Sequence, residues 1–179
     1  MTPAKSSPRS TLARLRKLAS QIAAQRERLN ILLFTLDVDL PNEEIARQLQ
    51  GQLGRLDLAA DVATAGPERV RSAIDGKFDD VDVLVVLANS GSEAEDRLME
   101  LVQWLLANGR TSLAQNLVFA QWGSSRRQTS PIFDHVVLED SYVSQIQQSG
   151  RRFPWAAASH ESWNLADAVL SYAVGLRVE

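Results

Sequence analysis

The sequence predicts an α/β protein: a three-layer open sheet of four or five mainly parallel strands, flavodoxin-like or Rossmann-like, with an extra N-terminal helix. Two observations support this prediction. Short, almost unbroken apolar runs, typical of strands buried on both faces, alternate along the chain with segments of helical apolar spacing. Right-handed crossovers then place helices on both faces of the sheet, and we expect the strand order 2-1-3-4-5.

The clearest strand is the apolar run VDVLVVLA at residues 81–88. A polar turn follows it, and helical spacing of apolar residues then continues to Gly109. Ser92 and Glu95 have the spacing of a capping box, and Gly109 is a typical helix stop. This part of the chain therefore predicts a strand, a short polar turn and a well-bounded helix.

The N-terminal region predicts a frayed tail followed by a basic amphipathic helix over residues 10–29. Its apolar positions recur at intervals of three and four residues: Leu12, Leu15, Ala19, Ile22 and Leu29. The helix packs on the domain, binds a protein partner or a second copy, or serves as a targeting presequence. We favour the first two alternatives, because no cleavable linker separates it from the next strand. The sequence therefore predicts a basic tail and amphipathic helix at residues 1–29, followed by a single α/β domain at residues 30–179.

The remaining elements follow from the same two patterns. Strands are expected at residues 31–36, 58–65, 117–120 and 132–138, and helices at residues 41–56, 67–75, 139–148 and 162–176. The first turn of the helix at residues 41–56 contains acidic residues, which suit a helix N-terminus. The terminal helix has its apolar face at Trp163, Ala166, Val169, Leu170 and Ala173.

Composition indicates one ordinary globular domain, since 45% of the 179 residues are hydrophobic and 23% are charged. The absence of cysteine excludes disulfides, thiolate metal sites and cysteine nucleophiles. Every apolar run is shorter than the roughly 18 residues of a membrane span. We therefore expect a soluble, cytoplasmic protein.

Charge is distributed unevenly along the chain. The net charge is −3, but residues 1–28 contain seven basic residues and one acidic residue, so the remainder is near −9. An acidic body of this kind repels the phosphate backbone of nucleic acids. Nucleic-acid binding is therefore not expected outside the N-terminal helix.

Polar residues follow several predicted strands, at the edge of the sheet where open α/β folds bind ligands. We predict a nucleotide or nucleoside site there, in which Asp37 and the turn amides orient a ribose, the arginines hold phosphate and a tryptophan stacks on the base. Core packing is the competing interpretation of that tryptophan. The predicted ligand-binding residues are Asp37, Asn89, Ser90, Gly91, Ser92, Trp122, Arg126 and Arg127.

Metal binding is not predicted. Asp37 and Asp39 precede a helix, where acidic residues are commonly N-terminal caps rather than Mg²⁺ ligands. Neither His135 nor His160 has the spacing of a metal ligand. The identity of any cofactor is left open.

The central segment resembles nucleoside deoxyribosyltransferase-like and TIR-like domains over about thirty residues. The resemblance lies in the sequences VLVVL at residues 83–87, GSEAE at residues 91–95, and Glu100 with the later ANGR at residues 107–110. It implies cleavage of the N-glycosidic bond of a nucleoside or NAD by a glutamate on the helix after a central strand. The distance from Gly91 assigns that role to Glu95, whereas the distance from Gly109 assigns it to Glu100.

Two functions therefore remain open from the sequence. The first is a nucleotide- or nucleoside-binding domain with N-glycosidase activity, in which a carboxylate stabilises an oxocarbenium-like transition state. The second is a non-catalytic protein-protein interaction or regulatory module of the same fold, which associates through residues 10–29. Whether the chain is an enzyme is not decided by the sequence.

Overall fold

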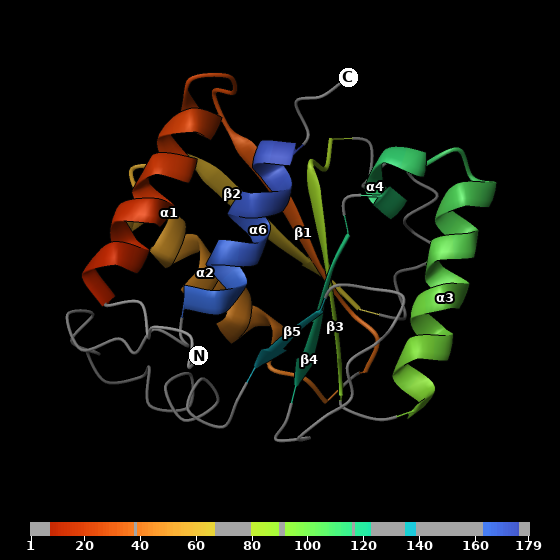
Figure 1. The fold of residues 1–179 in the computed structure, drawn as a ribbon. Helices are drawn as coiled ribbons and strands as arrows, with labels where there is room; N and C mark the ends of the chain where they lie inside the picture. Colours follow the sequence, from red (N-terminus) through yellow and green to blue (C-terminus); the bar gives the residue numbers. More distant parts are fainter. Residues whose placement is uncertain are drawn as a thin grey trace, which may run out of the picture.

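A five-stranded parallel sheet forms the centre of the structure (Figure 1). The computed structural model describes residues 8–37, 39–66, 80–89, 92–115, 117–122, 135–138 and 163–175. The strands are β1 (Leu29–Thr35), β2 (Ala60–Ala65), β3 (Val83–Asn89), β4 (Leu117–Trp122) and β5 (His135–Leu138). Their order is β2-β1-β3-β4-β5, and every neighbouring pair is parallel. The predicted fold class and strand order are therefore confirmed.

Helices cover the sheet on both faces, which gives the three layers seen in Figure 1. Helices α1 (Pro8–Ala23), α2 (Asn42–Arg55) and α6 (Asn164–Gly175) pack on one face, where Ile31 and Leu33 of β1 point. Helices α3 (Ser92–Ala107) and α4 (Thr111–Gln115) pack on the other face, with Leu32 and Phe34. The alternation of side chains along β1 thus supplies two separate cores, as the period of a strand requires.

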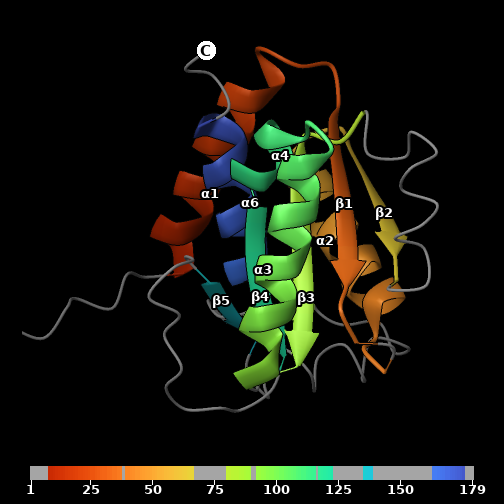
Figure 2. The same cartoon turned by 90° about the vertical axis from the view of Figure 1, so that its right-hand side faces the viewer.

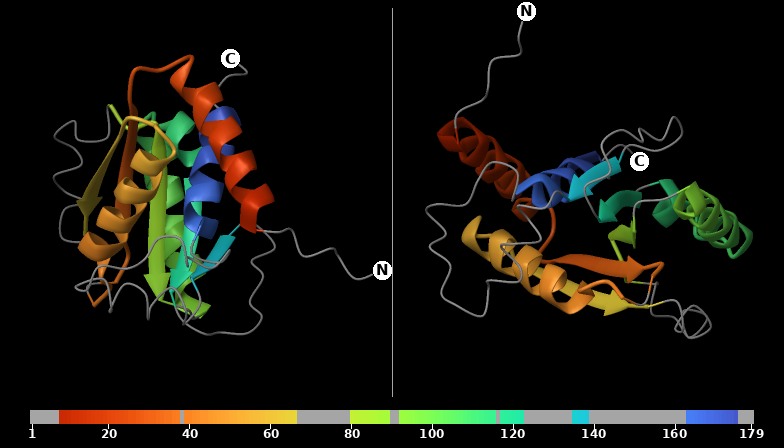
Figure 3. Two further views of the ribbon diagram at one scale, coloured as in Figure 1. Left: turned by 90° about the vertical axis from the view of Figure 1, so that its left-hand side faces the viewer. Right: turned by 90° about the horizontal axis from the view of Figure 1, so that it is seen from below.

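The N-terminal helix packs against the domain rather than standing apart from it. Leu15, Ala19 and Ile22 of α1 are buried in the same core as α6, and the two helices lie side by side in both views of Figure 3. The predicted end of this helix at residue 29 was wrong, because α1 ends at Ala23. Leu29 instead begins β1, since its N–H donates to the Ala59 carbonyl at 2.9 Å. Leu29 therefore pairs with β2 as part of the sheet and does not continue the helix.

Three arginines of the basic N-terminal region form ion pairs within the domain. Arg14 of α1 pairs with Asp167 of α6. Arg26 and Arg28, in the connection between α1 and β1, pair with Asp82 and Asp61. A single pair of this kind contributes little, up to about 1 kcal/mol at a surface. Together they nevertheless pair three of the seven basic residues at positions 1–28 with aspartates of the acidic body.

Helix ends agree in part with the sequence. Gly109 follows α3 with φ of 71°, in the left-handed region that glycine adopts at helix ends, so the predicted stop is confirmed. Helix α6 confirms the predicted terminal helix, and all five residues expected on its apolar face are buried. Helix α4 was not predicted. The helices expected at residues 67–75 and 139–148 lie outside the described residues.

None of the helices in the described part of the chain combines the length and the apolarity needed to cross a membrane.

Adjacent leucines on α3 offer a test of this packing. Leu105 is 0% exposed in the core between α3 and the sheet, whereas Leu106 is 48% exposed. We expect Leu105→Ala to lower the free energy of unfolding by about 2–5 kcal/mol, because it leaves a cavity. Leu106→Ala should change it by no more than about 0.5 kcal/mol. Urea denaturation of both variants measures the difference, and equal losses would contradict the described orientation of α3.

Candidate functional site

The candidate site lies at the carboxyl ends of β1 and β3, where several polar groups contact one another. β1 lies between β2 and β3, so the chain leaves β1 in one direction along the sheet and β3 in the other. Ligands of doubly wound sheets bind in the crevice at this switch point. Asp37 lies just beyond the end of β1, and Asn89 is the last residue of β3.

Asp37 connects the two strand ends to α3. Its Oδ2 accepts a hydrogen bond from the Asn89 backbone N–H at 2.8 Å. Its Oδ1 accepts one from Arg97 Nη1, also at 2.8 Å. Arg97 Nη1 lies 3.2 Å from the Leu36 carbonyl as well. The carboxylate therefore holds β1, β3 and α3 together at the switch point.

Arg97 was not among the residues predicted from the sequence. Its side chain is 39% exposed, yet its Nε atom is buried and has no hydrogen-bond partner among the described residues. A guanidinium carries five N–H donors, and the two contacts above use only Nη1. One signal was available, because Arg97 lies in the second turn of α3 beside the buried Leu98. Such a position lies at the border of the apolar face of the helix, from which a long side chain can reach the end of the sheet.

The two candidate catalytic glutamates lie on different sides of α3. Glu95 and Arg97 are two residues apart, which is about 200° around a helix, so Glu95 is directed away from the side that contacts Asp37. Glu100 is three residues after Arg97 and therefore on its side, but about one turn further from the carboxyl edge. Glu95 is half-buried and Glu100 is exposed. The structure thus brings neither glutamate into contact with Asp37.

The end of β4 places its two polar side chains on opposite faces of the sheet. Trp122 is half-buried and packs against the core beneath α1, α2 and α6. Gln121, its neighbour, is buried on the side of α3. The contact between Asp37 and Arg97 also lies on the α3 side, so the structure does not bring Trp122 to it. The structure therefore shows Trp122 in contact with the core, and stacking of its ring on a base stays a prediction.

Several predicted ligand-binding residues cannot be placed. Ser90, Gly91, Arg126 and Arg127 lie outside the described residues, as does the side chain of Ser92. The capping box that Ser92 was expected to form with Glu95 stays a prediction for the same reason. The described part of the predicted site therefore consists of Asp37, Asn89 and Trp122, to which the structure adds Arg97.

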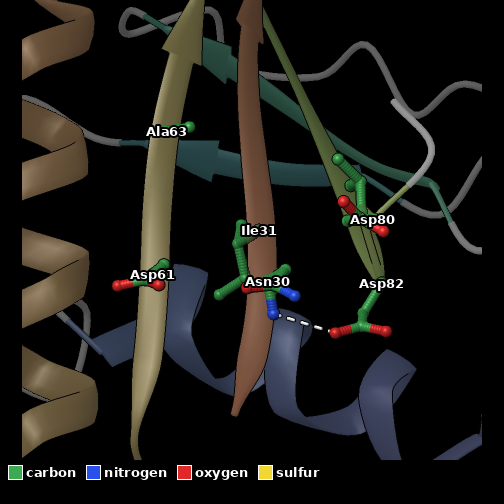
Figure 4. A pocket seen from close by; sticks show the side chains of 7 residues that line it. Asn30, Ile31, Asp61, Ala63, Asp80 and Asp82 are labelled. Carbon is green, nitrogen blue, oxygen red and sulfur yellow. Dashed lines mark hydrogen bonds between the residues drawn. The ribbon is translucent and has the colours of Figure 1, made fainter. Parts of the chain in front are cut away.

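An open hollow of about 610 Å³ lies elsewhere, toward the amino ends of the strands (Figure 4). Its lining includes Asn30, Asp61, Asp80 and Asp82, and the Asn30 backbone N–H donates to Asp82 Oδ2 at 2.8 Å. Helix α3 covers β3 and β4 but leaves this part of β1 and β2 uncovered in Figure 2. Two of the three carboxylates, Asp61 and Asp82, are occupied by the arginine pairs described above.

Among the residues that the structure describes, no group of three or more His, Cys, Asp or Glu side chains is placed to hold a metal ion.

Comparisons with known proteins found matches among solved structures alone. No family model matches the sequence, and no curated protein matches it. Two solved structures align with it: RecJ in complex with Mn²⁺ from Thermus thermophilus, at 19% identity and a TM-score of 0.38, and an exonuclease RecJ bound to manganese, at 17% and 0.37. The alignments cover 99% and 92% of this chain but only 22% and 38% of those proteins. At such TM-scores the two similarities carry no argument about function.

Removal of the Asp37 carboxylate tests the described network. We expect Asp37→Ala to lower the free energy of unfolding by about 1–3 kcal/mol, because the Asn89 N–H and the Arg97 guanidinium both lose their acceptor. Asp39→Ala is the matched control, since Asp39 is exposed two residues away. Its effect should stay within about 0.5 kcal/mol. Equal effects in urea denaturation would show that Asp37 does not hold the strand ends together.

Proposed function

We propose that this chain binds a nucleotide or nucleoside at the switch point between β1 and β3. The observation that carries the proposal is the convergence of Asp37, Asn89 and Arg97 at this edge of the sheet. A carboxylate, a strand-end amide and a guanidinium are the groups that recognise sugar hydroxyls and phosphate oxygens. Helix α3 begins at the same edge, and the N-terminus of a helix favours a negatively charged group.

Arg97 has donors to spare for such a ligand. Its Nη1 is held by Asp37 and Leu36, which fixes the guanidinium against the end of β1. A guanidinium has further N–H donors besides those of Nη1, and the side chain is 39% exposed, so an oxyanion that reaches its exposed part can accept a charge-assisted hydrogen bond. In this proposal Arg97 joins Arg126 and Arg127 as a phosphate contact, and the residues 89–92 turn with Asp37 orients the sugar.

One observation favours the non-catalytic alternative, a protein-protein interaction or regulatory module. Both oxygens of Asp37 already accept hydrogen bonds within the chain, one from Asn89 and one from Arg97. A carboxylate so occupied can serve simply to join β1, β3 and α3. In that case the partner surface includes the exposed side of α1, because the apolar side of α1 is buried against α6.

Binding distinguishes the two proposals. Thermal unfolding of the protein should be followed with NAD, nucleotides and nucleosides, each present in excess. A ligand at 100 times its dissociation constant adds roughly 2.7 kcal/mol to the free energy of unfolding. Arg97→Met should then weaken binding of that ligand at least about tenfold by calorimetry, the loss of one charged hydrogen bond.

Arg47→Met provides the matched control, because Arg47 is exposed on α2, which covers the opposite face of the sheet. It should bind the ligand as the wild type does. If no compound in the panel stabilises the protein, the nucleotide proposal fails and the interaction module takes its place.

Cleavage of an N-glycosidic bond is a separate part of the proposal, in which Glu95 or Glu100 is the catalytic carboxylate. Release of free base or nicotinamide from any ligand that binds would establish turnover. The double variant Glu95→Gln and Glu100→Gln should lower the rate by at least about 100-fold, and the two single variants identify which glutamate acts. Glu44→Gln, at an exposed position of α2, should leave the rate unchanged. Full activity in the double variant would refute both assignments.

A further inference from the structure

Among the strands that the structure describes, β2 lies at one end of the sheet. β2 is hydrogen-bonded to β1 on one side only. Every second residue of an edge strand directs its N–H and C=O groups away from the sheet, where another strand can pair with them. Proteins prevent such pairing by covering or interrupting the exposed edge.

A side chain of α2 occupies this edge. Gln50 Nε2 donates to the Ala60 carbonyl, and Gln50 Oε1 accepts a hydrogen bond from the Val62 backbone N–H at 2.8 Å. Both backbone groups belong to β2 and point away from β1. In a parallel ladder, one residue of the adjoining strand donates its N–H to residue i−1 and accepts from the N–H of residue i+1. The carboxamide of Gln50 makes this same pair of bonds around Asp61.

We propose that Gln50 acts as a one-residue substitute for a sixth strand, which keeps the β2 edge from pairing with β2 of a second copy of this chain. A primary carboxamide has the donor and the acceptor of a peptide group, so it satisfies the edge without a partner. Two copies related by a twofold axis would present identical β2 edges to each other. Five of the six residues of β2 are small or β-branched and uncharged, namely Ala60, Val62, Ala63, Thr64 and Ala65. The sixth, Asp61, is paired with Arg28, so the strand has little net charge with which to repel a second copy.

A second contact from α2 keeps this cover in register. Thr64 Oγ1 donates to Glu43 Oε1 at 2.8 Å, two residues along β2 from Val62. Glu43 and Gln50 are seven residues apart on α2, which is about two helical turns and hence the same side of the helix. The side chains of one helical stripe thus follow the outer edge of β2 over much of its length.

Replacement of Gln50 by alanine opens the edge while retaining the residue with the highest helix propensity. Sedimentation velocity over a rising series of concentrations should show Gln50→Ala self-associating, with a mean mass about twofold above that of the wild type at the highest concentration. Gln103→Ala, a glutamine at an exposed position of α3, should sediment as the wild type does.

A double variant separates pairing at the edge from loss of stability. Val62→Pro removes the N–H that the added strand would use, and proline is tolerated on edge strands at positions facing outward. The double variant Gln50→Ala and Val62→Pro should therefore return to the wild-type mass. If Gln50→Ala keeps the wild-type mass at every concentration, or if the double variant associates as strongly, the proposal is overturned.

Hydrogen exchange on the wild type gives an answer that does not depend on the folding of any variant. The Val62 amide should exchange at least about tenfold more slowly than amides in free turns, because Gln50 Oε1 accepts its hydrogen bond. Exchange at the rate of an open chain would show that Gln50 does not cover the edge.

Discussion

The burial of β3 on both faces is the constraint on which the rest of the architecture depends. Residues 83–88 are fully buried, and they alternate between the core beneath α1, α2 and α6 and the core beneath α3 and α4. A strand without a polar side requires a helical layer on each face of the sheet. The polar contacts of Asp37, Arg97 and Gln50 accordingly lie at strand ends and at the outer edge of the sheet.

The sequence was informative where structure follows from local pattern. Continuous apolar runs identified the strands, and right-handed crossovers between parallel strands placed helices on both faces. The strand order was expected by analogy with flavodoxin-like sheets. The end of α1 could not be read in this way, because Leu29 suits the apolar face of a helix as well as a strand. Its place in β1 is decided by pairing with Ala59, a residue thirty positions away. The spacing of apolar residues along the sequence gives no information on hydrogen bonds between residues so far apart.

The candidate site was predictable in location but not in composition. Asp37 and Asn89 were expected at the carboxyl edge because polar residues followed apolar runs. Arg97 was missed, since its role depends on the rotation of α3 relative to β1, which sequence spacing alone does not give. The same rotation directs Glu95 away from Asp37. The resemblance left Glu95 and Glu100 as alternatives, and sequence spacing alone does not show in which direction either side chain points from the packed helix.

The basic N-terminal region does not act as a free charged arm in the folded protein, because several of its arginines are paired within the domain. A basic N-terminal segment on an acidic body resembles an arm that binds polyanions, but Arg14, Arg26 and Arg28 are paired with aspartates of α6, β3 and β2 regions. Each pair is modest alone, yet the three lie along the path from α1 into β1. The Arg14 pair joins α1 to α6, the other two join the connection after α1 to the sheet, and all three reduce the positive charge left for an external partner. Arg16 and Lys17 stay exposed on α1, and a partner drawn to this helix would meet that short basic stretch rather than the whole segment.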